Sequence, residues 1–145
     1  MSMEHYRAAQ KAGKKDLQTR TSQKLPVEMP ALDTILEHVD ISGEVPLGLV
    51  DIPTELIVGT KTYGRASSFA PNFMPILGES TEFAAKWSSL CDAHLKEGIR
   101  DPIVAYEYMN HYYIQEGNKR VSVLKYFDAI SIPGYVTRIC LLYTS

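Results

Sequence analysis

The hydrophobic positions of residues 81–97 recur at helical spacing and predict the most regular element of the chain. Ser80 can cap this helix at its N-terminus, and Gly98 can end it. One face of the helix collects the less polar side chains: Phe83, Ala84, Trp87, Leu90, Cys91, His94 and Leu95. We therefore expect Trp87 in the core and Cys91 buried and unreactive. His94 is expected at the border of this face and not in a metal site.

The pattern after this helix changes to short aromatic and apolar runs. They predict two antiparallel strands joined by a short turn: residues 103–108, residues 109–111 as the turn, and residues 112–115. A helical pattern follows at residues 119–127, with Val121 and Leu124 on its apolar face. Residues 130–139 are then typical of a strand. We expect this strand at a sheet edge, because Pro133 lacks a backbone donor.

The N-terminal part of the chain has weaker patterns. Residues 3–13 have helix-forming composition and predict a helix that Gly13 stops, followed by a polar linker at residues 14–30. A short amphipathic segment is expected at residues 31–39. Two β-like pieces come next: residues 45–50 and residues 55–58. Residues 59–78 predict a long irregular loop, and such loops are usually functional or mobile.

Composition adds limits to this picture. The chain of 145 residues has a net charge of −2 and can bury one core. Its first 24 residues hold six Lys or Arg and two acidic residues, a net charge of +4. This basic arm can contact nucleic acid or a partner, or it can be a solvated leader. No apolar run of transmembrane length and no signal-peptide core is present in the sequence, and the two cysteines lack metal-ligand spacing. We expect a cytoplasmic protein and no membrane partner.

Candidate chemistry concentrates in residues 112–127, which read YYIQEGNKRVSVLKYF. A strand runs into Glu116-Gly117-Asn118-Lys119-Arg120, and a helix follows at once. Backbone N–H groups, the helix dipole and two cationic side chains could all point at one phosphate group. The alternative is a tight turn with solvated charges, and a single glycine does not decide between them.

The surroundings of this motif resemble the ParB/sulfiredoxin superfamily. A helix ends at Gly98, a strand begins with Pro102-Ile103-Val104, and Ile132-Pro133-Gly134-Tyr135-Val136 follows the motif helix. The resemblance covers about residues 44–139. It implies an α/β (α+β) fold with a small mixed sheet flanked by helices. Residues 1–43 would then form an N-terminal helix, basic arm and linker, and residues 44–139 the domain.

The resemblance also implies a nucleotide site. Gly117 and Arg120 match the family motif, in which glycine lets the backbone approach a phosphate and arginine can hold phosphate oxygens bidentately. Lys119 adds a charge and Asn118 an amide donor. Glu116 is a candidate for holding Mg²⁺ and for a catalytic role. Arg65, a weaker candidate, lies in the early loop where relatives place another phosphate-binding arginine; the alternative is a solvent-facing loop arginine. The implied cofactors are CTP or ATP with Mg²⁺.

Departures from the family motif limit the function. Asn118 stands where sulfiredoxins carry the cysteine nucleophile, so sulfinic-acid repair is not expected. The same residue replaces a glutamate that chromosome-partition ParB proteins use in their CTP switch. Three hypotheses remain: a nucleotide- or phosphate-binding regulatory module linked to DNA, a Mg²⁺-dependent kinase, nucleotide hydrolase or nuclease, and a degenerate interaction domain. A homodimer is compatible with each hypothesis.

The last six residues, CLLYTS, resemble the translation of a common sequencing adapter. We therefore expect residues 140–145 to be a non-native tail that contributes nothing to the fold, with the natural reading frame cut near Ile139. On this interpretation the chain is truncated, and a DNA-binding domain would lie beyond the cut.

Overall fold

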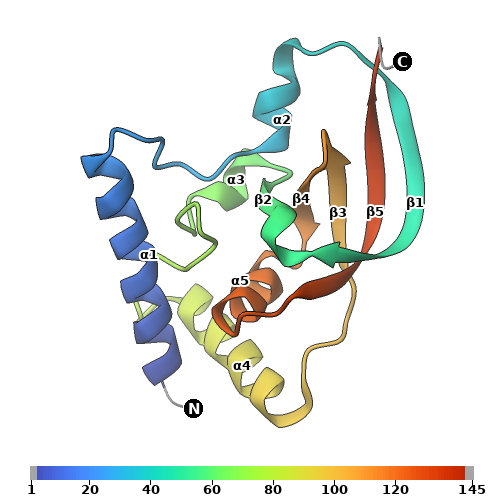
Figure 1. Cartoon of the computed structure of the whole chain (residues 1–145). Coiled ribbons are helices and arrows are strands. Elements are labelled where there is room, and N and C mark those ends of the chain that lie inside the picture. Colours follow the sequence, from blue (N-terminus) through green and yellow to red (C-terminus); the bar gives the residue numbers. More distant parts are fainter. Residues whose placement is uncertain (1–2, 143–145) are drawn as a thin grey trace.

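The computed structural model describes residues 3–142, and these are the described residues below. One mixed sheet has the strand order β1-β5-β3-β4-β2 (Figure 1). The strands are β1 (Ile41–Pro53), β2 (Ile57–Thr60), β3 (Ile103–Tyr108), β4 (His111–Glu116) and β5 (Ser131–Leu141). β1 pairs with β5 and β3 with β4 in antiparallel fashion, whereas the β3–β5 and β2–β4 pairs are parallel. The predicted α/β class with a small mixed sheet flanked by helices is confirmed.

The helices gather beside and below this sheet as Figure 1 is drawn. They are α1 (Glu4–Ser22), α2 (Leu32–Ile35), α3 (Tyr63–Ala66), α4 (Glu82–Glu97) and α5 (Asn118–Tyr126). Two 3₁₀ turns complete the set: Leu36–His38 and Thr54–Leu56. α4 packs against both α1 and α5, so the first helix of the chain is part of the same folded body as the motif helix.

The predicted stop of α1 at Gly13 is wrong. The helix continues through this residue to Ser22, so the linker predicted at residues 14–30 is helical over its first half. Gly13 is buried, and a Cβ atom there would lie 2.7 Å from the carbonyl oxygen of Pro75. The glycine therefore serves the close approach of α1 to the segment after α3, and not the end of a helix.

Two apolar clusters form most of the core. One fills the space between the sheet, α5 and the segment after α3, and the other joins α1, α4 and α5. In the second cluster Tyr6 and Trp87 meet edge to face, with ring centroids 5.5 Å apart. Trp87 Nε1 donates to Ser122 Oγ at 2.9 Å, which satisfies the buried indole. Cys91 is only 1% exposed, so its predicted burial is confirmed, while its lack of reactivity stays a prediction.

The position predicted for the last strand is also wrong. β5 lies inside the sheet, between β1 and β3, and the edges are β1 and β2. Pro133 faces Asp51 of β1, and β3 joins one residue later, where Ile103 pairs with Gly134. The proline thus precedes the part of the strand that is paired on both sides, which is why an interior strand tolerates it.

Smaller differences concern caps and turns. Thr81, and not Ser80, caps α4, because its Oγ1 accepts a hydrogen bond from the Ala84 N–H at 3.1 Å. Gly98 ends this helix as predicted, with φ of 79°. The β3–β4 turn uses the residues Met109 and Asn110, both with positive φ, whereas His111 already belongs to β4.

The segment predicted as an irregular loop, residues 59–78, is largely packed. It contains the end of β2 and all of α3, and several of its apolar side chains are buried: Ala66, Phe69, Ala70, Phe73 and Met74. Polar composition concealed these buried positions.

At the other end of the chain, Cys140 and Leu141 continue β5 and pair with Gly43 and Ile41. The expectation that residues 140–145 add nothing to the fold is therefore wrong for these two residues, while the origin of the tail stays a prediction. Residues 143–145 lie outside the described residues.

Candidate functional site

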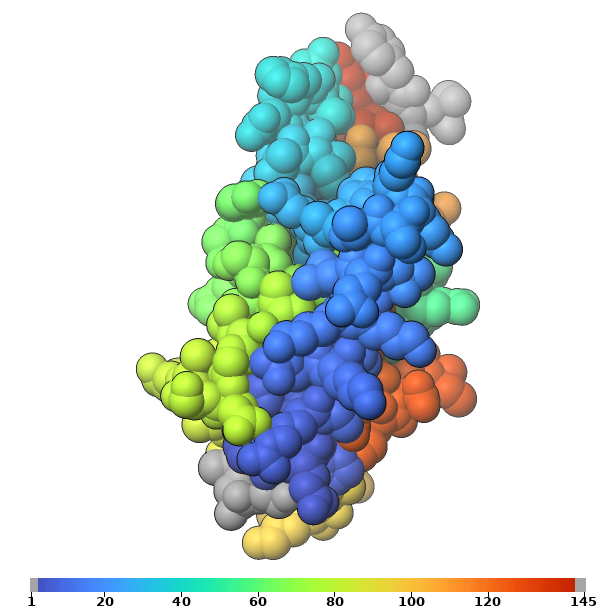
Figure 2. All heavy atoms as spheres, turned by 90° about the vertical axis from the view of Figure 1, so that its left-hand side faces the viewer, coloured from blue at the N-terminus to red at the C-terminus, as the bar shows by residue number. Residues whose placement is uncertain are grey.

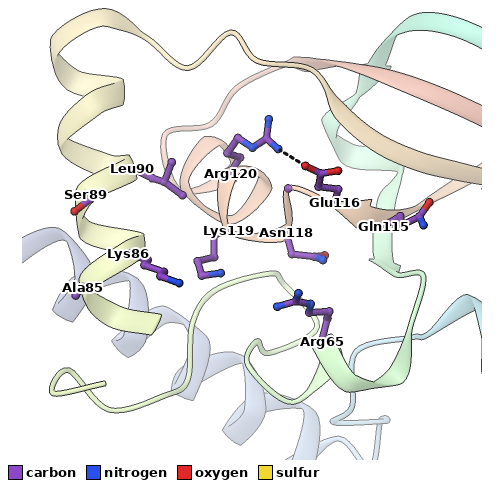
Figure 3. A pocket seen from close by; sticks show the side chains of 11 residues that line it. Arg65, Ala85, Lys86, Ser89, Leu90, Gln115, Glu116, Asn118, Lys119 and Arg120 are labelled. Carbon is purple, nitrogen blue, oxygen red and sulfur yellow. Dashed lines mark ion pairs between the residues drawn. The ribbon is translucent and has the colours of Figure 1, made fainter. Parts of the chain in front are cut away.

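A pocket of about 550 Å³ lies where α3, α4 and the β4–α5 turn meet (Figure 3). Its lining comes from these three places: Arg65, Ala85, Lys86, Ser89, Leu90, Gln115, Glu116, Gly117, Asn118, Lys119 and Arg120. The structure therefore brings together all six residues that the sequence marked for this site, Arg65 included. Whether they bind a ligand stays a prediction.

The β4–α5 turn is shaped by Gly117. Its φ of 101° and ψ of 25° are left-handed, and a Cβ atom would lie 2.7 Å from Ile103 Cγ2, so a larger residue would be strained and crowded. Gly117 is the N-cap residue of α5, and it has no side chain with which to cap the helix. The first N–H groups of α5 are thus left to another acceptor, and the positive end of the helix dipole lies at the pocket.

Asn118 is the first residue of α5 and lines this pocket. The residue is only 7% exposed, yet its Oδ1 atom has no hydrogen-bond partner among the described residues. Burying an amide oxygen without a hydrogen-bond donor costs free energy, so such an atom usually marks a place for water or for a ligand group that donates. Figure 3 shows this side chain at the inner wall of the pocket, next to the uncapped helix end.

Three cations approach the pocket from three different elements. Figure 3 shows Arg65 of α3, Lys86 of α4 and Lys119 of α5 around one open space. Burial lowers the pKa of Lys119 below its ordinary value, and the nearby charges of Arg65 and Lys86 lower it further. The cluster is therefore strained by like charges, which an anion would relieve.

Acidic and aromatic neighbours contact two of these cations, Lys86 and Lys119. Glu82 forms an ion pair with Lys86 at 3.0 Å and opposes the lowering of the Lys119 pKa. The Lys119 ammonium also lies over the ring of Phe83, 5.4 Å from its centroid. Lys86 was not a candidate from sequence. Its spacing from Glu82 is that of an ordinary solvated helix pair, and only the packing of α4 beside α5 shows its second neighbour, Lys119.

Arg120 has a different environment from the other cations. Its side chain is 18% exposed, and its Nη1 donates to the carbonyl oxygens of Asp101 at 3.2 Å and Pro102 at 3.1 Å. In Figure 3 it points to the opposite side of the helix end from Lys119. Arg120 thus ties the β4–α5 turn to the segment before β3, and its guanidinium is partly committed to that role.

Glu116 is a poor centre for a metal site. Its side chain is 74% exposed, and its Oε1 lies 4.0 Å from Arg120 Nη2, the limit of an ion pair. It is the only carboxylate in the pocket lining. Among the described residues, no group of three or more His, Cys, Asp or Glu side chains could hold a metal ion.

None of the described helices is long and apolar enough to span a membrane.

Comparisons with known proteins add little to this geometry. No family model matches the chain, and no curated protein matches it. Among solved structures, sulfiredoxin from Arabidopsis thaliana is similar with a TM-score of 0.42 and 20% sequence identity, over 61% of this chain and 82% of that one. A likeness this distant carries no argument about the site. The chain has an α/β fold, a mixed five-stranded sheet flanked by helices.

Proposed function

We propose that the pocket binds the phosphate groups of a nucleotide at the N-terminus of α5. The observation that carries this proposal is the uncapped N-terminus of α5 at Gly117, which opens on a pocket lined by the cations Arg65, Lys86 and Lys119. A phosphate group there would accept hydrogen bonds from the first N–H groups of α5. It would also separate the charges of Lys119 and Arg65. The Asn118 Oδ1 atom is itself an acceptor, so its partner would be a donor, such as a sugar hydroxyl or an exocyclic amino group of the nucleotide.

The residues would divide their roles according to their contacts. Lys119 and Arg65 would bind phosphate oxygens directly, and Lys86 would add a third charge from α4. Arg120 would act mainly as a positioning residue, because its Nη1 already binds two carbonyl groups. Any Mg²⁺ would be held largely by the phosphates, with Glu116 as the one carboxylate in the pocket lining.

The rest of the pocket supports a nucleotide over inorganic phosphate. Its volume of about 550 Å³ lies within the range of small-molecule sites, roughly 300–1,000 Å³. Ala85 and Leu90 give it an apolar wall, while Gln115 adds an amide that can hydrogen-bond a base or sugar. This combination of a cationic end and an apolar wall suits a charged ligand with a flat organic part.

Binding is favoured over catalysis by the composition of the lining. It offers neither His nor Cys, and its one carboxylate, Glu116, is mostly exposed. A kinase or nucleotide hydrolase needs a base or further metal ligands near the reacting phosphate. A pure interaction domain is disfavoured in turn by the buried Asn118 Oδ1 atom, an acceptor that has no donor among the described residues.

The test is calorimetric titration with CTP, ATP, GTP and ADP, each with Mg²⁺. Charge-assisted hydrogen bonds contribute about 1.5–3 kcal/mol, so Lys119→Ala and Arg65→Ala should each weaken binding by about tenfold or more. Lys96→Ala, an exposed lysine of α4 outside the lining, is the matched control and should change nothing. Arg120→Ala should weaken binding together with stability, because it releases the turn.

Two results would contradict this proposal. If the unmodified protein binds none of these nucleotides at millimolar concentration, the pocket is not a site for them. If it binds one of them and Lys119→Ala binds equally well, the site lies elsewhere.

A further inference from the structure

A row of cations follows the exposed side of α1, away from the nucleotide pocket. Arg7, Lys11, Lys14 and Lys15, which we call the basic row, are spaced at four, seven and eight positions and are all exposed. The opposite side of the helix carries the buried residues: Tyr6, Ala9 and Gly13. Figure 2 views the molecule from the side where α1, in blue, faces the reader. None of the row lines the pocket at α5.

Little negative charge balances this row. Arg7 pairs with Glu79 at 2.8 Å, and Glu4 also acts on its charge. No ion pair holds Lys11, Lys14 or Lys15 within residues 3–142. The acidic residue nearest in sequence, Asp16, is occupied. Its Oδ2 accepts from Arg20 at 3.1 Å and from the Asn72 N–H at 3.2 Å.

The surface along the row is hollowed and is lined by long side chains that end in polar groups. A hollow of about 630 Å³ is lined entirely by α1 side chains, namely the basic row with Gln10 and Gln18. The row spans eight residues, or about 12 Å at 1.5 Å per residue. Over such a length duplex DNA presents several phosphate groups, since it carries one charge per about 1.7 Å of its axis.

We propose that the basic row binds the phosphate backbone of duplex DNA without reading its sequence. Lysine ammonium groups and glutamine amides are donors that commonly contact phosphate oxygens. They extend from a helix whose other side is fixed in the core by Tyr6 and Ala9. The row is therefore held on a rigid support, so that little ordering of the backbone is needed on binding.

Other partners of a basic helix would need features that α1 lacks. Protein interfaces are built around buried aromatic or apolar anchors, and no large hydrophobic side chain of α1 is exposed. The first such residue along the described chain is Leu25. A membrane-surface helix needs a free apolar face, but the apolar face of α1 is buried against α4. The basic row is exposed, with no exposed large hydrophobic side chain on the same helix, which suits a polyanion whose charges are evenly spaced.

The experiment is fluorescence anisotropy with a labelled 20-base-pair duplex of arbitrary sequence, at 50 and 200 mM NaCl. The double variant Lys11→Gln/Lys15→Gln removes two charges of the row and keeps helix propensity nearly unchanged. Lys96→Gln/Arg100→Gln removes two exposed charges elsewhere and is the matched control. Circular dichroism and melting curves verify that both variants fold as the parent protein does.

We expect the parent protein to bind the duplex at 50 mM NaCl. The row variant should bind about tenfold more weakly or worse, because it loses two phosphate contacts. Each lost contact also reduces the magnitude of the slope of log K against log salt by about 0.9. Its slope should therefore fall by nearly 2, while the control should lose less than threefold in affinity. Both proteins should keep their nucleotide affinity, because the row does not line that pocket.

Three outcomes would overturn the proposal. The first is no binding to the duplex by the parent protein at 50 mM NaCl. The second is an equal loss in both double variants, which would mean that overall charge and not the row governs binding. The third is tighter, row-dependent binding of polyglutamate than of the duplex, which would identify an acidic protein as the partner. Each is independent of the nucleotide titration, so the two proposals can fail separately.

Discussion

Gly13 and Gly117 show how one residue type serves two physical needs. Gly117 lies at the mouth of the pocket, where the pattern of strand, glycine and helix predicted a turn, and its backbone there is left-handed. Gly13 lies in the middle of α1 with ordinary helical geometry, and its need is space beside Pro75. Sequence reasoning found the first need because it is local. It misread the second because the neighbour is some 60 positions away.

Replacement of Gly13 by alanine should therefore reverse the usual effect of helix propensity. On propensity alone, alanine in a helix is more stable than glycine by about 1 kcal/mol. Here the added methyl group would lie 2.7 Å from the Pro75 carbonyl oxygen, so we expect a net loss of about 1–3 kcal/mol. Gly64→Ala in α3 is the control, because nothing lies within 4 Å of its Cβ position. Urea unfolding of both variants measures the effect, and equal stability would contradict the close contact.

The lowered pKa of Lys119 predicts a pH dependence of nucleotide binding. A phosphate group is attracted to the charged ammonium, so affinity should be constant below the pKa of Lys119 and should fall as pH rises through it. Because burial, Arg65 and Lys86 lower this pKa, the fall should begin at a lower pH than for an ordinary lysine.

Titration calorimetry of the preferred nucleotide between pH 7 and pH 10 measures this fall, and a nucleotide without ionisable ring protons in that range is the suitable ligand. Lys119→Arg keeps its charge throughout, because the guanidinium stays protonated. Its affinity should stay nearly constant over that range. An identical decline in this variant would assign the titration to another group.

At the scale of elements, α4, the β3–β4 hairpin and α5 could all be predicted, because their signals are periodic and local. The failures lie where an element depends on distant partners. The extent of α1 depends on its contact with Pro75, and the interior place of β5 depends on where β3 begins. The packing of residues 66–74 depends on apolar side chains that a polar segment conceals.

The cap of α4 offers a sharp test at this scale, because two adjacent hydroxyl residues compete for the role. Thr81 Oγ1 accepts from the Ala84 N–H, and its hydroxyl donates to the Gly78 carbonyl at 2.7 Å. Thr81→Ala should therefore destabilise the protein by about 1 kcal/mol, within the range for lost N-caps. Ser80→Ala should change stability by less than about 0.5 kcal/mol. Melting curves of the two variants decide, and the reverse order would restore Ser80 as the cap.

At the scale of the whole molecule, the residues of the site were predicted more completely than the contacts that these residues make. Arg65 and residues 116–120 do share one pocket. The contribution of Lys86 and the commitment of Arg120 to Asp101 and Pro102 could not be foreseen. Both follow from how α4 and the segment before β3 pack around α5, which no local pattern encodes.

Two deletions of different length test whether the C-terminal residues 140 and 141 contribute to stability. Removing residues 140–145 takes away Cys140 and Leu141, which pair with β1, whereas removing 142–145 leaves both in place. The longer deletion should be less stable than the shorter one by about 1 kcal/mol. For a chain of this size that corresponds to a melting temperature lower by about 3 °C. Identical melting temperatures would mean that the end of β5 contributes nothing.

The pairing of β1 with β5 also has a consequence for how the protein is made. β1 has β5 as its one strand neighbour in the sheet, and the two are joined across residues 53 to 131. A ribosome adding about 5–20 residues per second would need roughly 4–16 s to cross that interval. During this time β1 would wait without its neighbour, exposing a long strand edge to other chains. Folding of the sheet should therefore be completed only after β5 has been made, with nonlocal pairing as the slow step.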